Sequence, residues 1–163
     1  MPELPEVETI RRDLEPEISG RVITGVQIHK PDIILPPHDT ASFQRRVKGR
    51  GIAAIGRRAK YLLFQLDDNG IIQVQLRMSG RFALGREVPD PDEFRHIAAR
   101  LKLDDGRTLF YDDMRRLGGF RLLEPAEWER EEARLGPEPL DGSLTPAEFV
   151  ARLRARKRVL KPL

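Results

Sequence analysis

The sequence contains no cysteine and only three histidines, His29, His38 and His96. Disulfide bonds and thiolate metal sites are therefore excluded, and the scattered histidines do not predict a metal site, so no metal ligands are expected in this chain. Long hydrophobic runs are also missing, since no stretch of about 18 apolar residues occurs, which excludes a membrane span. The start is acidic and rich in proline, unlike a signal peptide, so the cytoplasm is the expected compartment.

A strong charge of one sign is lacking as well, because the formal net charge is only +3. The charge is unevenly placed: six bases and no acid follow Phe149. A second basic cluster lies at 45–60, and Arg115 and Arg116 form a third. Such clusters favour a polyanionic partner such as nucleic acid. The alternative for each cluster is an ordinary solvated face.

The length of 163 residues predicts one domain with a real core. Apolar residues at helical spacing predict a helix over 4–18, which Pro16 is expected to end early and Gly20 to stop. Alternation predicts a strand over 22–28, and Thr40 is expected to cap a short helix. Further strands are expected at 51–57, 60–67, 71–78, 81–84, 96–103, 108–112 and 118–123. The fold class is α+β, mainly β: an antiparallel β-sandwich of about eight strands, flanked by an N-terminal helix and C-terminal helices.

The C-terminal part differs in composition from the strands. A charged helix is expected after Pro125, and a stiff linker at 136–140. Thr145 begins a capping box with proline at the first helical position, which predicts another helix. We therefore divide the chain into a body at 1–140 and a helical, basic segment at 141–163.

The opening residues Met1-Pro2-Glu3 carry the first chemistry. Initiator methionine is usually removed before proline, which would leave a free prolyl amine. An α-amino group has a reference pKa of about 8, so a useful fraction is unprotonated at neutral pH and attacks electrophilic carbons. The carboxyl group of Glu3 is placed to give or take a proton. An ordinary helix start, with proline before it and glutamate in its first turn, would have the same sequence.

Three further stretches each allow a chemical and a structural interpretation. Lys60, at a strand start, is either an acid, base or phosphate contact in a cleft, or a solvated lysine. Met78, at a Ser-Gly turn, is either a core residue or an exposed wedge that enters a base stack. Arg115 and Arg116 suit phosphate or base contacts, unless the paired acids before them merely neutralise them.

Five motifs follow one another along almost the whole chain. They are Pro-Glu-Leu-Pro-Glu-Val-Glu-Thr at 2–9, Arg-Arg-Ala-Lys-Tyr-Leu at 57–62, Leu-x-Met-Ser-Gly at 76–80, Asp-Met-Arg-Arg-x-Gly at 113–118 and Leu-Gly-Pro-Glu-Pro-Leu at 135–140. In order and approximate spacing they resemble the formamidopyrimidine-DNA glycosylase family. The start favours this oxidised-purine branch over the related endonuclease VIII type. The resemblance makes 1–140 an N-terminal catalytic domain.

The resemblance implies base-excision repair. The family removes oxidised purines from double-stranded DNA and cuts the abasic site by β,δ-elimination through a Schiff base on the N-terminal proline. Pro2 would attack the sugar C1′, and Glu3 would donate a proton to the opening sugar. Glu6 would help to position the nucleophile or the lesion. Lys60 would be the proton donor in elimination and a phosphate contact.

The resemblance also implies contacts with DNA. Met78, Arg115 and Leu117 would fill the gap that the lesion leaves in the base stack. Contacts with phosphates or nearby DNA are implied for Gln75, His96, Arg116, Arg156 and Lys161. Leu117 stands where the family commonly has phenylalanine, so it cannot stack as an aromatic ring does. Gln75 stands where the family usually has histidine, so it offers a hydrogen bond without a charge.

The family continues beyond Lys-Pro-Leu into a helix–two-turns–helix region and a four-cysteine zinc finger, which this sequence lacks. No cofactor is expected in this chain, and one zinc ion is expected in the zinc finger of the full-length protein. We expect the chain alone to bind DNA weakly, with low or no glycosylase activity, as a monomer in the bacterial cytoplasm that associates with the nucleoid. The alternative is a non-catalytic paralogue that recognises damaged DNA. The presence of Pro2, Glu3 and Lys60 favours the enzyme.

Overall fold

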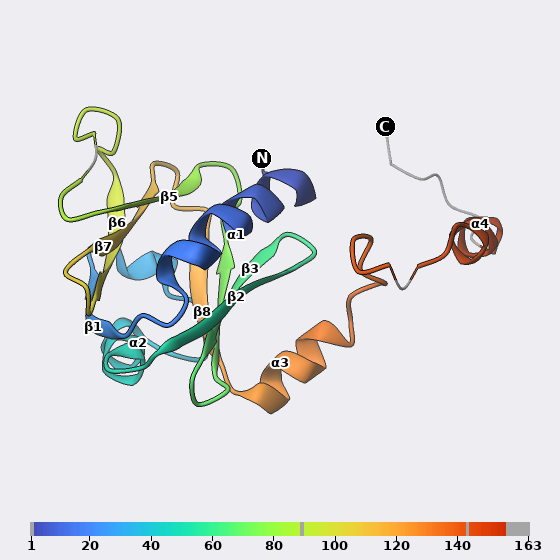
Figure 1. The fold of residues 1–163 in the computed structure, drawn as a ribbon, viewed down its shortest axis with the longest axis horizontal. Coiled ribbons are helices and arrows are strands. Elements are labelled where there is room, and N and C mark those ends of the chain that lie inside the picture. Colours follow the sequence, from blue (N-terminus) through green and yellow to red (C-terminus); the bar gives the residue numbers. More distant parts are fainter. Residues whose placement is uncertain (1, 89, 143, 156–163) are drawn as a thin grey trace.

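Two antiparallel sheets pack against each other in the computed structural model, which describes residues 2–88, 90–142 and 144–155 (Figure 1). Within these ranges each sheet has four strands. One has the order β2-β3-β4-β8, with β2 (Ile52–Arg58), β3 (Tyr61–Leu66), β4 (Ile71–Gln75) and β8 (Gly119–Leu123). The other has the order β1-β6-β7-β5, with β1 (Ile23–Ile28), β6 (Ile97–Leu103), β7 (Thr108–Asp113) and β5 (Gly80–Gly85). The predicted antiparallel sandwich of about eight strands is confirmed.

Aromatic side chains join the two sheets. Phe82 of β5 lies with its ring centroid 5.9 Å from that of Phe64 of β3. Tyr111 of β7 meets Phe120 of β8 edge to face, with the centroids 4.8 Å apart. Edge-to-face pairs of this kind stabilise a core beyond the apolar area that they bury. Tyr111 and Phe120 flank the loop at 113–118, so this loop leaves and re-enters the sheets at a rigid part of the core.

Helix α1 (Leu4–Ile18) packs on β2 and carries the N-terminus across the sandwich (Figure 1). It continues past Pro16 to Ile18, so the prediction that this proline ends the helix early is wrong. A proline in the last turn removes only one backbone donor, and the complete burial of Ile18 holds the end of the helix on the core. Gly20, with φ +80°, turns the chain after the helix.

A 3-10 turn, η1 (Pro31–Ile33), and a short helix, α2 (Thr40–Val47), follow β1. The residue that caps α2 is Asp39 and not, as predicted, Thr40. The Asp39 carboxylate accepts a hydrogen bond from the Ser42 N–H at 2.7 Å. Aspartate and threonine are both good N-caps, so composition alone does not decide between neighbours.

The strand predicted at 71–78 ends at Gln75, three residues early. Leu76 is buried, but Arg77 adopts φ +51°, a left-handed conformation that no strand contains. The chain therefore leaves the sheet before Met78. This turn places Met78 on the surface rather than in the core.

Helix α3 (Pro125–Glu132) follows β8 and buries Trp128 against Leu63 and Leu123. The segment 136–140 after it was predicted to be a stiff linker. Its Glu138 is only 8% exposed and is bound to the sandwich, so this segment is an anchored part of the body. The division of the chain at residue 140 stays a prediction.

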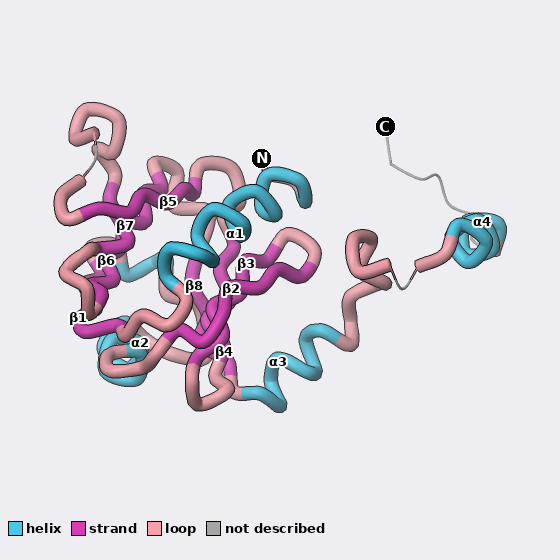
Figure 2. The backbone as a smooth tube through the Cα atoms, in the orientation of Figure 1, coloured by secondary structure: helices cyan, strands magenta, loops and turns pink. Residues whose placement is uncertain are grey.

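Helix α4 (Pro146–Arg154) lies away from the two sheets (Figure 2). The predicted capping box is present, since the Thr145 hydroxyl oxygen accepts a hydrogen bond from the Glu148 N–H at 3.2 Å. Phe149 and Val150 are exposed, so nothing in the described ranges covers the apolar side of this helix. None of the helices described here is long and apolar enough to cross a membrane.

Candidate active site

The N-terminus of α1 holds the first residues in place. Glu3 is the N-cap residue and forms a capping box with Glu6, whose carboxylate accepts a hydrogen bond from the Glu3 N–H at 3.0 Å. Such a box satisfies backbone donors that a helix start leaves unpaired. Pro2 precedes the cap, and Val7 in the first turn lines the same pocket, as in a hydrophobic staple. Glu6 thus orients Pro2 and Glu3 through the backbone.

The β2–β3 hairpin presents Lys60. Arg58 and Tyr61 form the last pair of the ladder, so Ala59 and Lys60 make a two-residue turn. Ala59 adopts φ +50°, as the first position of such tight turns requires. The Lys60 Nζ lies 2.6 Å from Glu3 Oε2. Because both side chains are about half exposed (47% and 55%), the ion pair is open to a substrate.

Pro2, Lys60 and Gln75 line one pocket of about 160 Å³, together with apolar side chains. The pocket joins the chain start, the β2–β3 turn and the end of β4, which are far apart in the sequence. It places the residue that would carry the amine beside an ammonium group and its carboxylate partner, Glu3. The arrangement suits attack on an electrophilic carbon combined with proton transfer.

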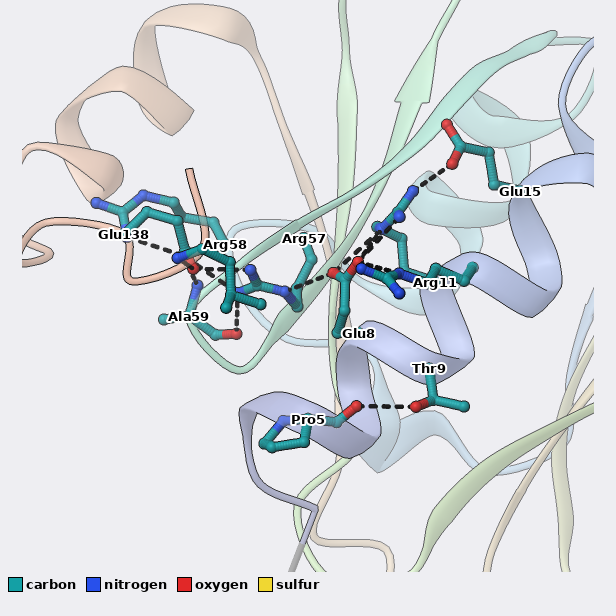
Figure 3. A network of polar contacts seen from close by, with 11 residues as sticks. Pro5, Glu8, Thr9, Arg11, Glu15, Arg57, Arg58, Ala59 and Glu138 are labelled. Atoms are coloured by element: carbon teal, nitrogen blue, oxygen red, sulfur yellow. Dashed lines mark hydrogen bonds and ion pairs between the residues drawn. The ribbon is translucent and has the colours of Figure 1, made fainter. Parts of the chain in front are cut away.

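A buried network that sequence reasoning missed ties these segments together (Figure 3). The Arg57 side chain is only 4% exposed and lies between two carboxylates. It donates to Glu8 Oε2 of α1 at 2.9 Å and to Glu138 Oε1 at 2.7 Å. The turn before Lys60 is held on both sides, because Arg57 Nη1 donates to the Ala59 carbonyl at 2.9 Å and the Ala59 N–H donates to Glu138 at 3.0 Å. One guanidinium therefore fixes Lys60 relative to α1.

The electrostatics of this network follow from its hydrogen bonds. Bonds from Arg11, and then from Arg57, lower the pKa of Glu8 from 4.5 to about 2. Burial alone would raise the pKa of Glu138, but the hydrogen bonds from Arg57 and the Ala59 N–H lower it below the ordinary value. The contact with Glu138, and then with Glu8, raises the pKa of Arg57. All three groups are charged at neutral pH.

Met78 and the loop at 113–118 form a second group. Met78 is 48% exposed and Leu117 is 51% exposed. The Arg115 Nη1 lies 3.0 Å from the Met78 Sδ, and the Arg115 N–H donates to the Ser79 Oγ at 3.0 Å. The three side chains that the resemblance assigns to the gap in DNA thus stand on exposed, connected loops, and the interpretation of Met78 as a core residue is wrong.

Asp113 organises this loop from within. It is 1% exposed, and its carboxylate accepts hydrogen bonds from the Arg116 N–H at 3.1 Å and the Gly118 N–H at 2.9 Å. It also accepts a hydrogen bond from the Ser79 hydroxyl group. The acid therefore binds backbone and hydroxyl donors and leaves the arginine side chains to face outward. The Arg116 Nη1 lies 3.2 Å from an Asp32 carboxylate oxygen.

Because the residues behind this loop are closely packed, we expect a larger residue at Gly118 to destabilise the fold. A Cβ added there would lie 2.1 Å from the Tyr111 hydroxyl oxygen and 2.5 Å from the Gln75 carbonyl oxygen. We expect Gly118→Ala to lower the free energy of unfolding by about 2 kcal/mol, because an overpacked core shifts its neighbours. Urea unfolding measures this, with Gly136→Ala as control, since a Cβ at Gly136 meets nothing within 4 Å. Equal stability of the two variants would contradict the prediction.

The other predicted residues lie elsewhere. The His96 N–H donates to Asp112 Oδ1 at 2.6 Å, and His96 lines two hollows that do not include Pro2. Arg156 and Lys161 lie outside the described residues, so the contacts implied for them stay predictions. In the part of the chain that is described, no group of three or more His, Cys, Asp or Glu is placed to hold a metal ion.

Comparisons with known proteins agree with this arrangement. The family model for the formamidopyrimidine-DNA glycosylase N-terminal domain matches residues 1–120. The formamidopyrimidine-DNA glycosylase of Chloroflexus aurantiacus is 42% identical over 164 residues, which cover 100% of this chain and 58% of that protein. That of Bacillus subtilis is 39% identical over 163 residues, 99% of this chain and 58% of that protein. The chain thus spans less than two thirds of these relatives.

A solved structure has the same fold. The Lactococcus lactis formamidopyrimidine-DNA glycosylase, bound non-covalently to DNA with an abasic site, matches with a TM-score of 0.81 at 30% identity. The match covers 94% of this chain and 58% of that chain. Because the family model, the relatives and the fold all agree with the ordered motifs, the chain belongs to the formamidopyrimidine-DNA glycosylase family.

Proposed function

We propose that this chain carries the catalytic part of a base-excision repair enzyme, a bifunctional DNA glycosylase and abasic-site lyase. Its substrate class is double-stranded DNA with oxidised purines or abasic sites. The observation that carries the proposal is that Pro2 and Lys60 line one pocket and that Lys60 is ion-paired with Glu3. The Lactococcus lactis relative bound to abasic-site DNA supports the choice of partner.

The proposed reaction begins at the nitrogen of Pro2. Its lone pair forms a bond to the sugar C1′ while the bond from C1′ to the damaged base breaks; the electron pair leaves with the base, and the proton that the prolyl nitrogen then loses neutralises the departing base. Glu3 donates a proton to the sugar ring oxygen, the C1′–O4′ bond opens, and an iminium (Schiff base) remains. This chemistry requires Pro2 to be the first residue, since behind Met1 its nitrogen is an amide.

Strand cleavage follows from the Schiff base. The iminium acidifies the C2′ proton, whose removal expels the 3′ phosphate by β-elimination, and a second elimination expels the 5′ phosphate. Lys60 donates a proton in elimination and contacts a phosphate. Its ion pair with Glu3, at 2.6 Å, places the ammonium group beside the acid that acts on the same sugar. Glu6 keeps Pro2 aimed at C1′ by way of the capping box.

The loops beside the pocket serve base extrusion. Taking the lesion out of the stack costs a few kcal/mol, and side chains that enter the gap offset this cost. We assign Met78, Arg115 and Leu117 to the gap, because Met78 and Leu117 are exposed and Arg115 touches Met78. We assign Gln75, His96 and Arg116 to contacts with neighbouring phosphates. The proposed setting is the bacterial cytoplasm at the nucleoid. The expected zinc ion belongs to a zinc finger that is not part of this sequence.

The test compares the chain with Glu3→Gln on two duplexes, one with 8-oxoguanine and one with an abasic site. We expect borohydride to trap the processed chain on the abasic duplex. In the full-length protein, Glu3→Gln is expected to lower the rate of base release roughly 10²-fold, because the amide cannot donate the proton. Glu129→Gln, a change at an exposed position of α3, is the matched control and is expected to leave the rate unchanged.

Two outcomes would contradict the proposal. A processed chain that binds damaged duplex but forms no covalent adduct would favour the non-catalytic, damage-recognising paralogue. An equal rate for Glu3→Gln and Glu129→Gln would remove Glu3 from the reaction. A gel that compares this chain with the full-length protein on an oxidised-purine duplex tests the expected weakness of the chain alone, and equal cutting by both would refute it.

A further inference from the structure

The outer face of the sheet β1-β6-β7-β5 carries cations that the proposed reaction does not use. Side chains alternate along β6, so Leu101 and Leu103 are buried in the core and Arg100 and Lys102 lie on the opposite face. Arg100 pairs in register with Phe110 of β7. Phe110 is only 3% exposed and yet belongs to neither core cluster, so its ring forms the floor of this outer face.

These cations lack acidic partners. The Arg100 guanidinium carbon lies 5.6 Å from the centroid of the Phe110 ring, and its buried Nε has no hydrogen-bond partner in the described ranges. In the same ranges no ion pair joins Lys30, Arg100 or Lys102 to a carboxylate. The arginines near the active site differ, since Arg57 is held by two carboxylates.

Three adjoining hollows connect this face with the loops that we assign to DNA. Arg100, Lys102 and Phe110 line the first, of about 420 Å³. The second, of about 470 Å³, shares Arg100 and also contains Lys30 and His96. The third, of about 330 Å³, shares His96 and reaches the loops that carry Met78 and Arg115. We call this continuous surface the outer-face track; its lining residues include His29, Lys30, Arg86, Arg95, His96, Arg100 and Lys102.

We propose that the outer-face track binds the sugar–phosphate backbone of duplex DNA that flanks the damaged nucleotide. Unpaired lysine and arginine side chains in a row match the repeated negative charge of a duplex, and the release of counterions favours the contact. The Arg100 Nε–H group has no hydrogen-bond acceptor in the described ranges, and a phosphate oxygen would supply one. The three hollows are lined by the carboxylates Glu87, Glu93 and Asp112, of which Glu93 and Asp112 are ion-paired with Arg81. The lysines and arginines of the lining outnumber these carboxylates, which leaves the track positive. The inference rests on the proposed function, because one duplex occupies both surfaces.

Duplex length is the variable that tests this inference. Fluorescence anisotropy measures binding of the 163-residue chain to abasic-site duplexes of about one and about three helical turns, about 10 and about 30 base pairs. We expect the double variant Arg100→Gln, Lys102→Gln to bind the long duplex roughly tenfold more weakly, with a slope of log affinity against log salt smaller by about 2. Its binding to the short duplex and its borohydride trapping there are expected to stay unchanged.

The matched control is Arg130→Gln, Arg134→Gln, one residue on α3 and one just after its end, which removes the same charge from exposed positions on another part of the fold (Figure 1). An equal loss in both double variants, or an equal loss on both duplexes, would overturn the inference. Lys102→Gln alone, at an exposed position, keeps the test valid if the double variant unfolds. If the wild-type chain binds the short duplex but is not trapped on it, the proposed function fails; if trapping persists without a length effect, only the outer-face track fails.

Discussion

A chain that keeps Met1 is expected to form no covalent adduct with an abasic-site duplex, whereas the same chain that starts at Pro2 is expected to be trapped by borohydride. The reason is the nitrogen itself. Behind Met1 it is an amide whose lone pair is delocalised into the carbonyl group, but after processing it is a secondary amine that attacks carbon. Loss of a covalent nucleophile lowers enzymatic rates by on the order of 10⁴-fold or more.

One preparation provides both states. Expression with the methionine aminopeptidase blocked yields the unprocessed chain, and later digestion with that peptidase exposes Pro2 without any change of side chain. Mass spectrometry reports the N-terminus, and a denaturing gel reports the adduct. Circular dichroism is expected to be the same for both states. Equal trapping of both states would show that another amine, such as that of Lys60, is the nucleophile.

The elements were predictable because their signals are local. Burial repeats along each segment, so periodicity predicted α1 and the strands. The same reasoning misplaced the end of β4, because Leu76 and Met78 continue the apolar alternation and only the left-handed conformation of Arg77 breaks it. The N-cap of α2 was ambiguous because the neighbouring residues Asp39 and Thr40 both suit that position.

The site was predictable only as a set of chemical groups. Motifs and the resemblance to a family pointed to Pro2, Glu3 and Lys60, but periodicity and composition do not place their side chains together. Arg57 and Glu138 are 81 residues apart in the sequence and meet only in the folded chain. A glutamate between two prolines is typical of an exposed linker, so nothing in the sequence apart from the motif at 135–140 predicted that Glu138 is buried.

That buried network leads to the largest expected effect on stability. Arg57→Met leaves the carboxylates of Glu8 and Glu138 without the guanidinium that joins them, and breaking a buried ion pair from one side costs about 4 kcal/mol. The control is Arg134→Met, whose ion pair with Glu131 is largely exposed and contributes about 0.5 kcal/mol. Urea unfolding at neutral pH measures both.

The stability lost in Arg57→Met is expected to depend on pH and to become smaller as the pH falls. The pKa of Glu8 is lowered from 4.5 to about 2 in the folded chain, and that of Glu138 is lowered too. A lowered carboxyl pKa stabilises the fold above pH 4.5, and this contribution is lost as the pH falls toward 2. Arg57→Met lacks part of that contribution at neutral pH. The difference in the free energy of unfolding between the wild type and Arg57→Met is therefore expected to narrow steadily below pH 4.5.

The same substitution separates positioning from chemistry. Arg57 contacts the Ala59 carbonyl but lines no wall of the Pro2 pocket, so its loss acts on Lys60 through the turn. Without urea, and at a temperature at which Arg57→Met stays folded, we expect elimination to slow more than formation of the Schiff base, because Lys60 serves the later step. Arg57→Lys is expected to restore stability only in part, since an ammonium group cannot bind two carboxylates and a carbonyl in one plane. A variant with unchanged stability and an unchanged ratio of the two steps would show that α1 and the hairpin hold Lys60 without Arg57.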